Sequence, residues 1–179
     1  MPFNQKPQKF NAKINTVTVG TGDKAVTIGG NSTFPFYTFD APTENSPKIG
    51  VEITDMGLDD FAPGIKAYYE GCTTMAEIAQ KAAAMEGGDF VVLNLEGGDP
   101  NGVNKSTEEL IAIVKEVADA IDCPLVVEGC KNVEKDAELL PKVAEALQGR
   151  NVIVMSEKEE KLQGNRCCSR TCLQPDRRR

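Results

Sequence analysis

The chain has no histidine and no tryptophan among its 179 residues, and only 6% of its residues are aromatic. Histidine is the usual general base of catalytic triads and the commonest side-chain ligand of metal ions. Its absence excludes a histidine-based triad and any histidine-ligated metal centre built by this chain alone. Site chemistry must therefore come from carboxylates, amides, hydroxyls, amines or thiols.

Long apolar runs are missing as well. No stretch approaches the ~20 residues needed to span a bilayer, and residues 1–10 lack the apolar core of a signal peptide. The formal net charge of -7 argues against a nucleic-acid footprint. No expected strand is followed by the glycine spacing of a nucleotide phosphate loop. We expect a cytoplasmic protein with neither a membrane nor a nucleic-acid partner.

The six cysteines fall into two groups. Cys72, Cys123 and Cys130 are scattered through the body, which suits buried free thiols in a cytosolic chain better than a disulfide framework. The other three, Cys167, Cys168 and Cys172, crowd a basic tail with no apolar period. Body and tail therefore differ in composition.

The amino-terminal part predicts a small antiparallel sheet. Residues 1–13 are polar and are expected to be loose. Residues 16–19 and 25–28 alternate apolar and polar side chains on either side of a Gly-rich turn, which is typical of a β-hairpin. The segment 34–39 holds four of the ten aromatic residues. It suits either a plug at the bottom of a core or a contact with a ligand or partner.

From Lys48 onward, short apolar runs alternate with helical periods. Strands are expected at 49–53, 90–93, 125–127 and 152–155, and helices are expected to start near Thr74, Ser106 and Asn132. The first two helix starts carry a glutamate three residues later, which makes a capping box. Pro141 lies inside the third helix, where we expect a kink or an early break. The pattern predicts a parallel sheet with right-handed crossovers.

Two α/β architectures fit this order, a doubly wound sheet and half of a (β/α)8 TIM barrel. Periodicity does not separate them. In either architecture the loops after the strands are where ligands bind, and the polar, Gly-rich stretch 94–104 follows the most apolar strand. The same residues also suit ordinary turns and helix caps.

Several longer segments resemble one family. They are V-T-I-G-G, T-F-P-F-Y-T-F-D, P-K-I-G-V-E-I-T-D, G-G-D-F-V-V-L-N-L-E-G-G-D-P-N-G-V-N, P-L-V-V-E-G-C, N-V-E-K-D-A-E-L-L and S-E-K-E-E. Together they resemble the small (delta) subunit of the corrinoid/iron–sulfur protein of the acetyl-CoA decarbonylase/synthase system. The resemblance covers residues 14–160.

The resemblance implies a leading β-hairpin and the first half of a TIM barrel, with four parallel strands and three helices. It also implies a heterodimer with a large subunit that carries an iron–sulfur cluster, and a cobamide held between the two chains. The cobamide would accept a methyl group from methyltetrahydrofolate through a methyltransferase and deliver it to acetyl-CoA synthase, in the reductive acetyl-CoA (Wood–Ljungdahl) pathway. This chain would be a non-catalytic subunit.

Side chains at the carboxyl ends of the strands are then expected to line the cofactor. They offer amide, hydroxyl and carboxylate groups to its amide-bearing rim, and no cobalt-ligating histidine comes from this chain. The expected cofactor-binding residues are Asp55, Asn94, Glu96, Asp99, Asn101, Glu128 and Ser156.

The chain also departs from the family. The resemblance ends after the fourth strand, and residues 161–179 have a different composition. We expect this tail to be disordered and out of frame, shifted at the A-rich codons near Lys161, so that the chain is truncated. The expected organisation is a loose segment 1–13, a half barrel with its hairpin over 14–160, and the tail.

An enzyme is the alternative function. A related TIM barrel that binds methyltetrahydrofolate and transfers its methyl group would use Asp55, Asn94 and Asp99 on the pterin ring. The hairpin and the aromatic segment before the first barrel strand favour the carrier subunit. A generic phosphate-binding barrel is a third reading, but the strands that usually bind phosphate would be missing.

Overall fold

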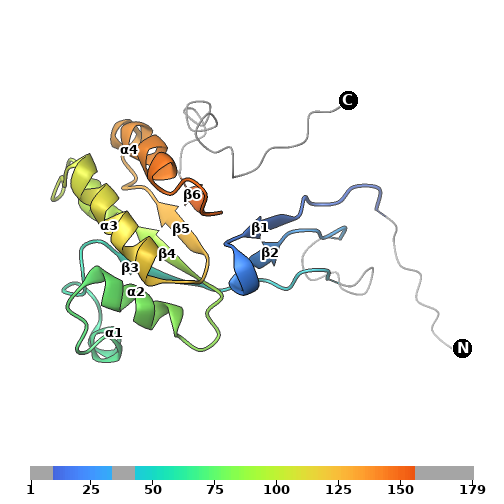
Figure 1. Ribbon diagram of the computed structural model, residues 1–179, viewed down its shortest axis with the longest axis horizontal. Coiled ribbons are helices and arrows are strands. Elements are labelled where there is room, and N and C mark those ends of the chain that lie inside the picture. Colours follow the sequence, from blue (N-terminus) through green and yellow to red (C-terminus); the bar gives the residue numbers. More distant parts are fainter. Residues whose placement is uncertain (1–9, 34–42, 156–179) are drawn as a thin grey trace, which may run out of the picture.

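The computed structural model describes residues 10–33 and 43–155, which form two sheets and the helices around them (Figure 1). The hairpin consists of β1 (Val17–Val19) and β2 (Val26–Ile28), with the short 3-10 helix η1 (Gly22–Lys24) between them. The parallel sheet consists of β3 (Gly50–Thr54), β4 (Phe90–Asn94), β5 (Leu125–Glu128) and β6 (Ile153–Met155). Its connections carry α1 (Pro63–Tyr68), α2 (Met75–Ala83), η2 (Glu96–Gly98), α3 (Thr107–Ala120) and α4 (Val133–Ala146).

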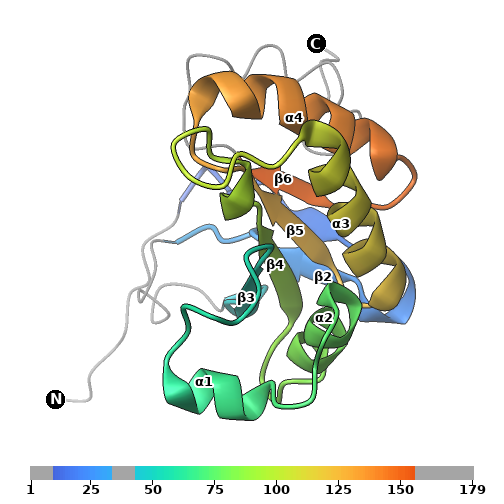
Figure 2. The same cartoon turned by 90° about the vertical axis from the view of Figure 1, so that its left-hand side faces the viewer.

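The order of the parallel strands separates the two architectures. Each strand pairs with the next along the chain, β3-β4-β5-β6, and all three pairs are parallel. A doubly wound sheet would reverse direction at a switch point and place helices on both faces. Here α2, α3 and α4 lie on one face of the sheet (Figures 1 and 2), as consecutive right-handed crossovers require in a barrel. The expected α/β fold with a partial barrel is confirmed.

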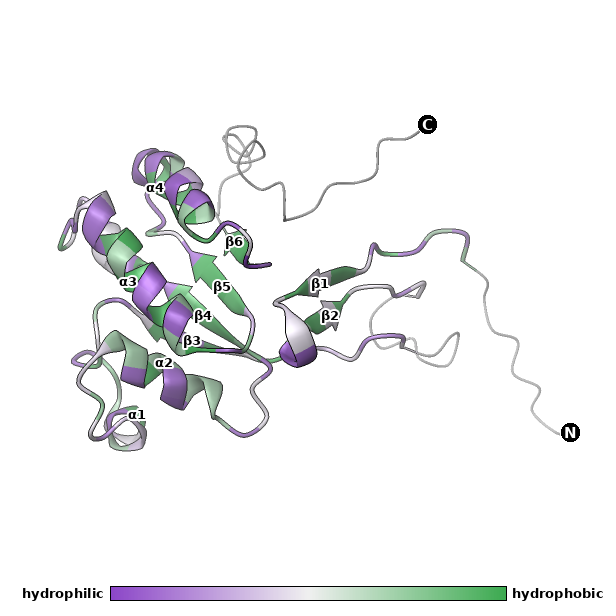
Figure 3. Cartoon of the chain, in the orientation of Figure 1, coloured by the Kyte–Doolittle hydropathy of each residue, from purple (hydrophilic) through white to green (hydrophobic). Residues whose placement is uncertain are grey.

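The core lies between the sheet and these three helices. Alternate residues of the strands point into it, so that Val91 and Leu93 of β4 and Val127 of β5 are fully buried. Leu110, Val114 and Val117 of α3 meet them from the helical side. Figure 3 shows apolar strands covered by helices whose outer surfaces are hydrophilic. This layer fixes the strands and hence the loops at their carboxyl ends.

The predicted β-hairpin is present. It packs at the end of the parallel sheet that lies opposite the carboxyl ends of the strands. Val17 pairs with Ile28, and Val19 pairs with Val26. The Gly20 amide donates to the Asn151 carbonyl at 2.6 Å, just before β6. A Cβ on Gly20, whose φ is +83°, would lie 2.7 Å from Pro124 Cγ, just before β5. The hairpin turn therefore contacts the amino ends of β5 and β6 and leaves the carboxyl ends open.

Both predicted capping boxes are present. The Thr74 hydroxyl accepts from the Glu77 amide and the Ser106 hydroxyl accepts from the Glu109 amide, while each glutamate accepts in return from its cap residue. Hydrogen bonds from Ser106 hold the pKa of Glu109 below its ordinary value. Folding thus favours the carboxylate form of Glu109. Its contribution to the free energy of unfolding is fully present above the ordinary pKa and is lost as pH falls through the lowered pKa.

Replacing Ser106 with alanine is expected to lower the free energy of unfolding by about 1 kcal/mol, because the Glu109 amide of α3 loses its acceptor and the Glu109 carboxylate loses the hydrogen bond from the Ser106 hydroxyl. Urea unfolding followed by circular dichroism measures this. Ser46→Ala serves as control, since Ser46 is exposed and caps no helix. Equal losses for both variants would refute the capping role.

Two sequence predictions are corrected. The chain has four α-helices among its described residues, not three, because α1 forms in the connection after β3. It is only six residues long and has no buried residue, so no apolar periodicity in the sequence predicts it. Of the kink or early break expected at Pro141, the early break does not occur, because α4 continues through it to Ala146. Burial of Leu139 and Val143 on either side of Pro141 offsets the missing hydrogen bond.

Some predictions concern residues beyond the described ranges. The aromatic segment 34–39, Ser156 and the tail 161–179 lie outside them, as do most of residues 1–13. Within the described residues no helix is both long and apolar enough to cross a membrane. The cytoplasmic location and the altered reading frame stay predictions.

Candidate functional site

Polar side chains from three neighbouring strands meet at the carboxyl edge of the sheet. Thr54, Asn94, Glu128 and Met155 are aligned across β3, β4, β5 and β6. The strand alternation that sends Val91 and Leu93 toward the helices sends this row to the opposite face. The sequence prediction that these strand ends lie together is therefore matched by the register.

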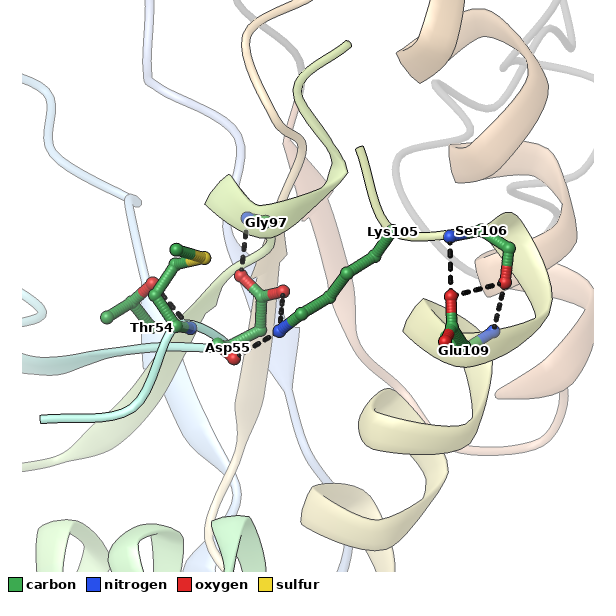
Figure 4. A network of polar contacts seen from close by, with 7 residues as sticks. Thr54, Asp55, Gly97, Lys105, Ser106 and Glu109 are labelled. Carbon is green, nitrogen blue, oxygen red and sulfur yellow. Dashed lines mark hydrogen bonds and ion pairs between the residues drawn. The ribbon is translucent and has the colours of Figure 1, made fainter. Parts of the chain in front are cut away.

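A buried ion pair lies directly behind this row (Figure 4). The Asp55 side chain is 0% exposed, and Lys105 Nζ lies 3.0 Å from its Oδ2. Lys105 Nζ also donates to the Asp55 carbonyl at 2.6 Å, and the Gly97 amide donates to Asp55 Oδ1 at 2.8 Å. Both carboxylate oxygens are thus occupied. Asp55 ties the end of β3 to both ends of the loop 96–105.

At Gly97 the loop 96–105 packs closely against the Asp55 side chain. A Cβ there would lie 2.3 Å from Asp55 Oδ2 and 3.0 Å from Lys105 Cδ. The Lys105 amide donates to the Gly97 carbonyl at 2.8 Å, which closes the loop. Within it, Asp99 Oδ1 accepts from the Asn101 amide at 2.9 Å and from its side chain at 3.1 Å. Asp99 and Asn101 therefore stabilise a turn, and Asn101 is exposed beside it.

Asn94 and Glu52 form a second polar pair on the open face of the sheet. Asn94 is 6% exposed, and its Nδ2 donates to Glu52 Oε1 at 3.2 Å. Its Oδ1 is buried without a hydrogen-bond partner. A buried amide oxygen left unpaired costs free energy, so this atom is suited to a donor that the chain itself does not supply.

The remaining predicted residues differ in exposure. Glu96 is exposed in η2 and lines a hollow of 290 Å³ at the end of β3. The Glu128 side chain is 17% exposed and lies 4.0 Å from Lys131 Nζ. Ser156 lies beyond the described part of the chain. The structure thus places Asn94 and Glu128 side by side on the open face, with Asp55 buried behind this row and Glu96, Asp99 and Asn101 in the adjoining loop.

Sequence reasoning missed two participants. Lys105 binds Asp55 across fifty residues of sequence, a separation at which no local pattern is informative. Glu52 did leave a signal, because a charged residue inside an apolar strand must face away from the core. Its neighbour Ile53 is 2% exposed, whereas Glu52 itself is exposed.

A third polar cluster lies under the end of β5. Asp136 is 4% exposed, and its Oδ1 accepts from the Cys130 amide at 2.8 Å and contacts the Cys130 thiol at 3.2 Å. A Cβ on Gly129 would lie 2.5 Å from the Asp136 carboxyl carbon. Burial raises the pKa of the Cys130 thiol to about 11. Cys72, Cys123 and Cys130 are free thiols; Cys130 is buried as expected, whereas Cys72 and Cys123 are only partly buried.

Cys130 is therefore expected to react slowly with disulfide reagents in the folded chain. At pH 8 its thiolate is about a thousandfold less abundant than the thiol, because the pKa lies about three units higher. Labelling with a thiol reagent, followed by mass spectrometry of peptides, should give a rate for Cys130 at least tenfold below its rate in denaturant. Equal rates in the two conditions would show that the thiol is neither buried nor perturbed.

The site is rich in hydrogen-bond acceptors and contains one partly buried amine, that of Lys105, which is already paired with Asp55. No group of three or more acidic or thiol side chains in the described ranges is arranged to hold a metal ion. Such a site suits the binding of amide, amine or hydroxyl donors.

Comparison with known proteins identifies one family. The family model described as CO dehydrogenase/acetyl-CoA synthase delta subunit matches residues 16–165. Acetyl-CoA decarbonylase/synthase complex subunit delta of Archaeoglobus fulgidus is 32% identical over 162 residues, covering 86% of this chain and 36% of that protein. Subunit delta 1 of Methanosarcina thermophila is 32% identical, covering 76% of this chain and 31% of that protein. Subunit delta of Methanothermobacter thermautotrophicus is 29% identical, covering 86% of this chain and 40% of that protein. The chain spans about a third of the length of these curated relatives.

Proposed function

Because this chain belongs to the CO dehydrogenase/acetyl-CoA synthase delta subunit family, we propose that it is a non-catalytic subunit of a corrinoid methyl carrier. Its relatives are named as subunits of an acetyl-CoA decarbonylase/synthase complex. The carrier would pass a methyl group from methyltetrahydrofolate, through a methyltransferase, to acetyl-CoA synthase in the reductive acetyl-CoA pathway. Its heterodimer partner would be a large subunit with the iron–sulfur cluster.

The family match is the observation that carries this proposal, and the strand-end site supports it. The rim of a corrin ring bears amide groups, which donate hydrogen bonds to carboxylate and amide oxygens. The unpaired Oδ1 of Asn94 and the carboxylates of Glu96 and Glu128 are such acceptors, and all three belong to one edge of the sheet.

The hollow at this edge is small. Its 290 Å³ lies at the lower limit of pockets for drug-sized ligands, well below the size of a corrinoid. Another polypeptide would therefore have to complete the cofactor site. The chain has no histidine, so a nitrogen ligand from imidazole would also have to come from elsewhere. Both points fit a cofactor shared with a larger subunit.

Each predicted residue then has a distinct role. Asn94, Glu96 and Glu128 would bind donors on the rim of the cofactor, and Asp99 and Asn101 would shape the loop beside it. Asp55 would act as a positioning residue, because Gly97 and Lys105 occupy its carboxylate. Ser156 stays a prediction. The bound cobamide would supply the methyl-transfer chemistry, and these side chains would hold and orient it.

Co-expression with the large corrinoid/iron–sulfur subunit of the same organism tests the proposal. We expect the two chains to co-purify with cobalt at about one atom per pair. An Asn94→Ala, Glu128→Ala variant should keep the partner but lose cobalt, whereas Glu86→Gln, an exposed change after α2, should keep both.

The enzyme alternative predicts the reverse result. This chain alone would then bind methyltetrahydrofolate in calorimetry, and no cobalt-containing partner would co-purify. The occupied carboxylate of Asp55 disfavours this reading, because a pterin could bind it only by displacing Lys105 or Gly97.

A further inference from the structure

The loop after β4 packs directly against the loop after β5. In η2, Gly98 contacts Cys130 so closely that a Cβ on Gly98 would lie 3.3 Å from Cys130 Cβ. Both residues are buried. The Leu95 amide, just before η2, also donates to the Glu128 carbonyl at 3.0 Å. Because this packing leaves no free space between the two loops, a displacement of one requires a movement of the other.

Asp136 holds the loop after β5 from the side of α4. It lies in the first turn of that helix and is 4% exposed. Its Oδ1 accepts from the Cys130 amide at 2.8 Å, and a Cβ on Gly129 would lie 2.5 Å from its carboxyl carbon. The carboxylate thus fixes two successive residues of the loop, one by a hydrogen bond and the other by close packing.

The next residue of this loop has a left-handed backbone conformation. Lys131 follows Cys130 with a φ of +67°, which residues other than glycine seldom adopt. Such a conformation persists when the surrounding structure fixes its neighbours. Cys130 is fixed by Asp136, and Asn132 is fixed as the cap of α4. Release of Cys130 would therefore allow this turn to relax and move the end of β5.

Asp136 makes these contacts with a charged group. It has no ion-pair partner among the described residues, and a charge removed from water without one is unfavourable. The positive end of the α4 dipole and the Cys130 amide offset part of that cost. An asparagine would offer the same acceptor oxygen without the charge. Comparison of the two side chains therefore separates the acceptor from the charge.

We propose that Asp136 is a positioning residue for the strand-end site. By holding Cys130 against Gly98, it keeps the loops after β4 and β5 in one fixed arrangement. These loops carry Glu96 and adjoin Glu128, so Asp136 acts on the site through the loop backbone. The effect on cobamide binding rests on the proposed function, whereas the coupling of the two loops does not.

Hydrogen–deuterium exchange of the full chain tests the coupling without any cofactor. In Asp136→Ala, residues 96–105 are expected to exchange at least about fivefold faster than in the unchanged chain, because one buried hydrogen bond is lost. Asp136→Asn keeps the acceptor oxygen and should retain slow exchange. Asp136→Glu keeps the charge, but its longer side chain does not fit against Gly129, so it should behave like Asp136→Ala. The glutamate variant carries the comparison if the alanine variant does not fold.

Val143→Ala is the control for a general loss of stability. Val143 is fully buried in the core on the same helix, seven positions after Asp136. Exchange of residues 96–105 is measured relative to α2 in each variant, and this ratio should stay unchanged in Val143→Ala. An unchanged ratio in both Asp136→Ala and Asp136→Glu would overturn the inference. An equal increase in Val143→Ala, or in Asp136→Asn, would overturn it as well.

The proposed complex with the large corrinoid/iron–sulfur subunit tests the consequence for the site. Asp136→Ala is expected to raise the Kd for added cobamide at least about fivefold while the partner stays bound, and Asp136→Asn should leave the Kd unchanged. Equal cobamide affinity of Asp136→Ala and the unchanged chain would overturn the positioning role. If no chain binds cobamide but exchange of residues 96–105 still responds to Asp136→Ala, the proposed function fails and the coupling of the loops stands.

Discussion

Replacing Asp55 with alanine is expected to lower the free energy of unfolding by about 3 kcal/mol. The variant leaves the Lys105 ammonium without its carboxylate and the buried Gly97 amide without an acceptor. Removing one partner of a buried ion pair costs about 3–5 kcal/mol. The lower figure applies here because Lys105 keeps 24% of its side chain exposed, so water can solvate its charge in part.

Two comparisons make this prediction specific. Asp122→Ala breaks an ion pair with Lys24 whose side chains are 75% and 59% exposed, and it should have little effect on stability. Combining Asp55→Ala with Lys105→Met should cost less than the sum of the two single changes, because the two side chains act on each other. A loss for Asp55→Ala no larger than that for Asp122→Ala would contradict the buried pair.

Replacing Gly97 with alanine is expected to cost about 1–3 kcal/mol and to displace the loop 96–105. The new methyl group would lie 2.3 Å from Asp55 Oδ2, an atom that is itself fixed by Lys105. Neither side chain can move without breaking the ion pair. Thermal unfolding gives the stability change, and NMR shifts of the Asn101 and Lys105 amides report the displacement.

Gly102 provides a control in the same loop. A Cβ there would lie 3.6 Å from its nearest neighbour, the Asp99 carbonyl oxygen, which is an ordinary contact distance. Gly102→Ala should therefore change stability by less than about 0.5 kcal/mol. Equal effects of the two substitutions would mean that Gly97 is not closely packed against Asp55.

Local features of this fold were predictable from sequence. The capping boxes at Thr74 and Ser106 depend on residues three positions apart, and the apolar runs of the four parallel strands need only their own alternation or length. The order of the strands could not be predicted from such local features. A doubly wound sheet and a barrel share the same local pattern, and only contacts between distant segments separate them.

The candidate site likewise combines features that follow from local sequence with contacts between distant segments. The prediction that Asp55, Asn94 and Glu128 gather at one edge needed only the rule that parallel strands end together. Which groups they bind depends on partners far along the chain. Asp55 meets Lys105 and Asn94 meets Glu52, and these pairings leave one carboxylate occupied and one amide oxygen unpaired.

Hydrogen–deuterium exchange of the proposed complex with the large corrinoid/iron–sulfur subunit would locate the cofactor on this chain. The complex is compared with and without cobamide. Slower exchange on cofactor binding is expected in residues 94–104 and 128–131, at the carboxyl ends of β4 and β5, with little change in α2, α3 and α4. Protection confined to the helices, or no difference between the two complexes, would contradict the placement of the cofactor at the strand ends.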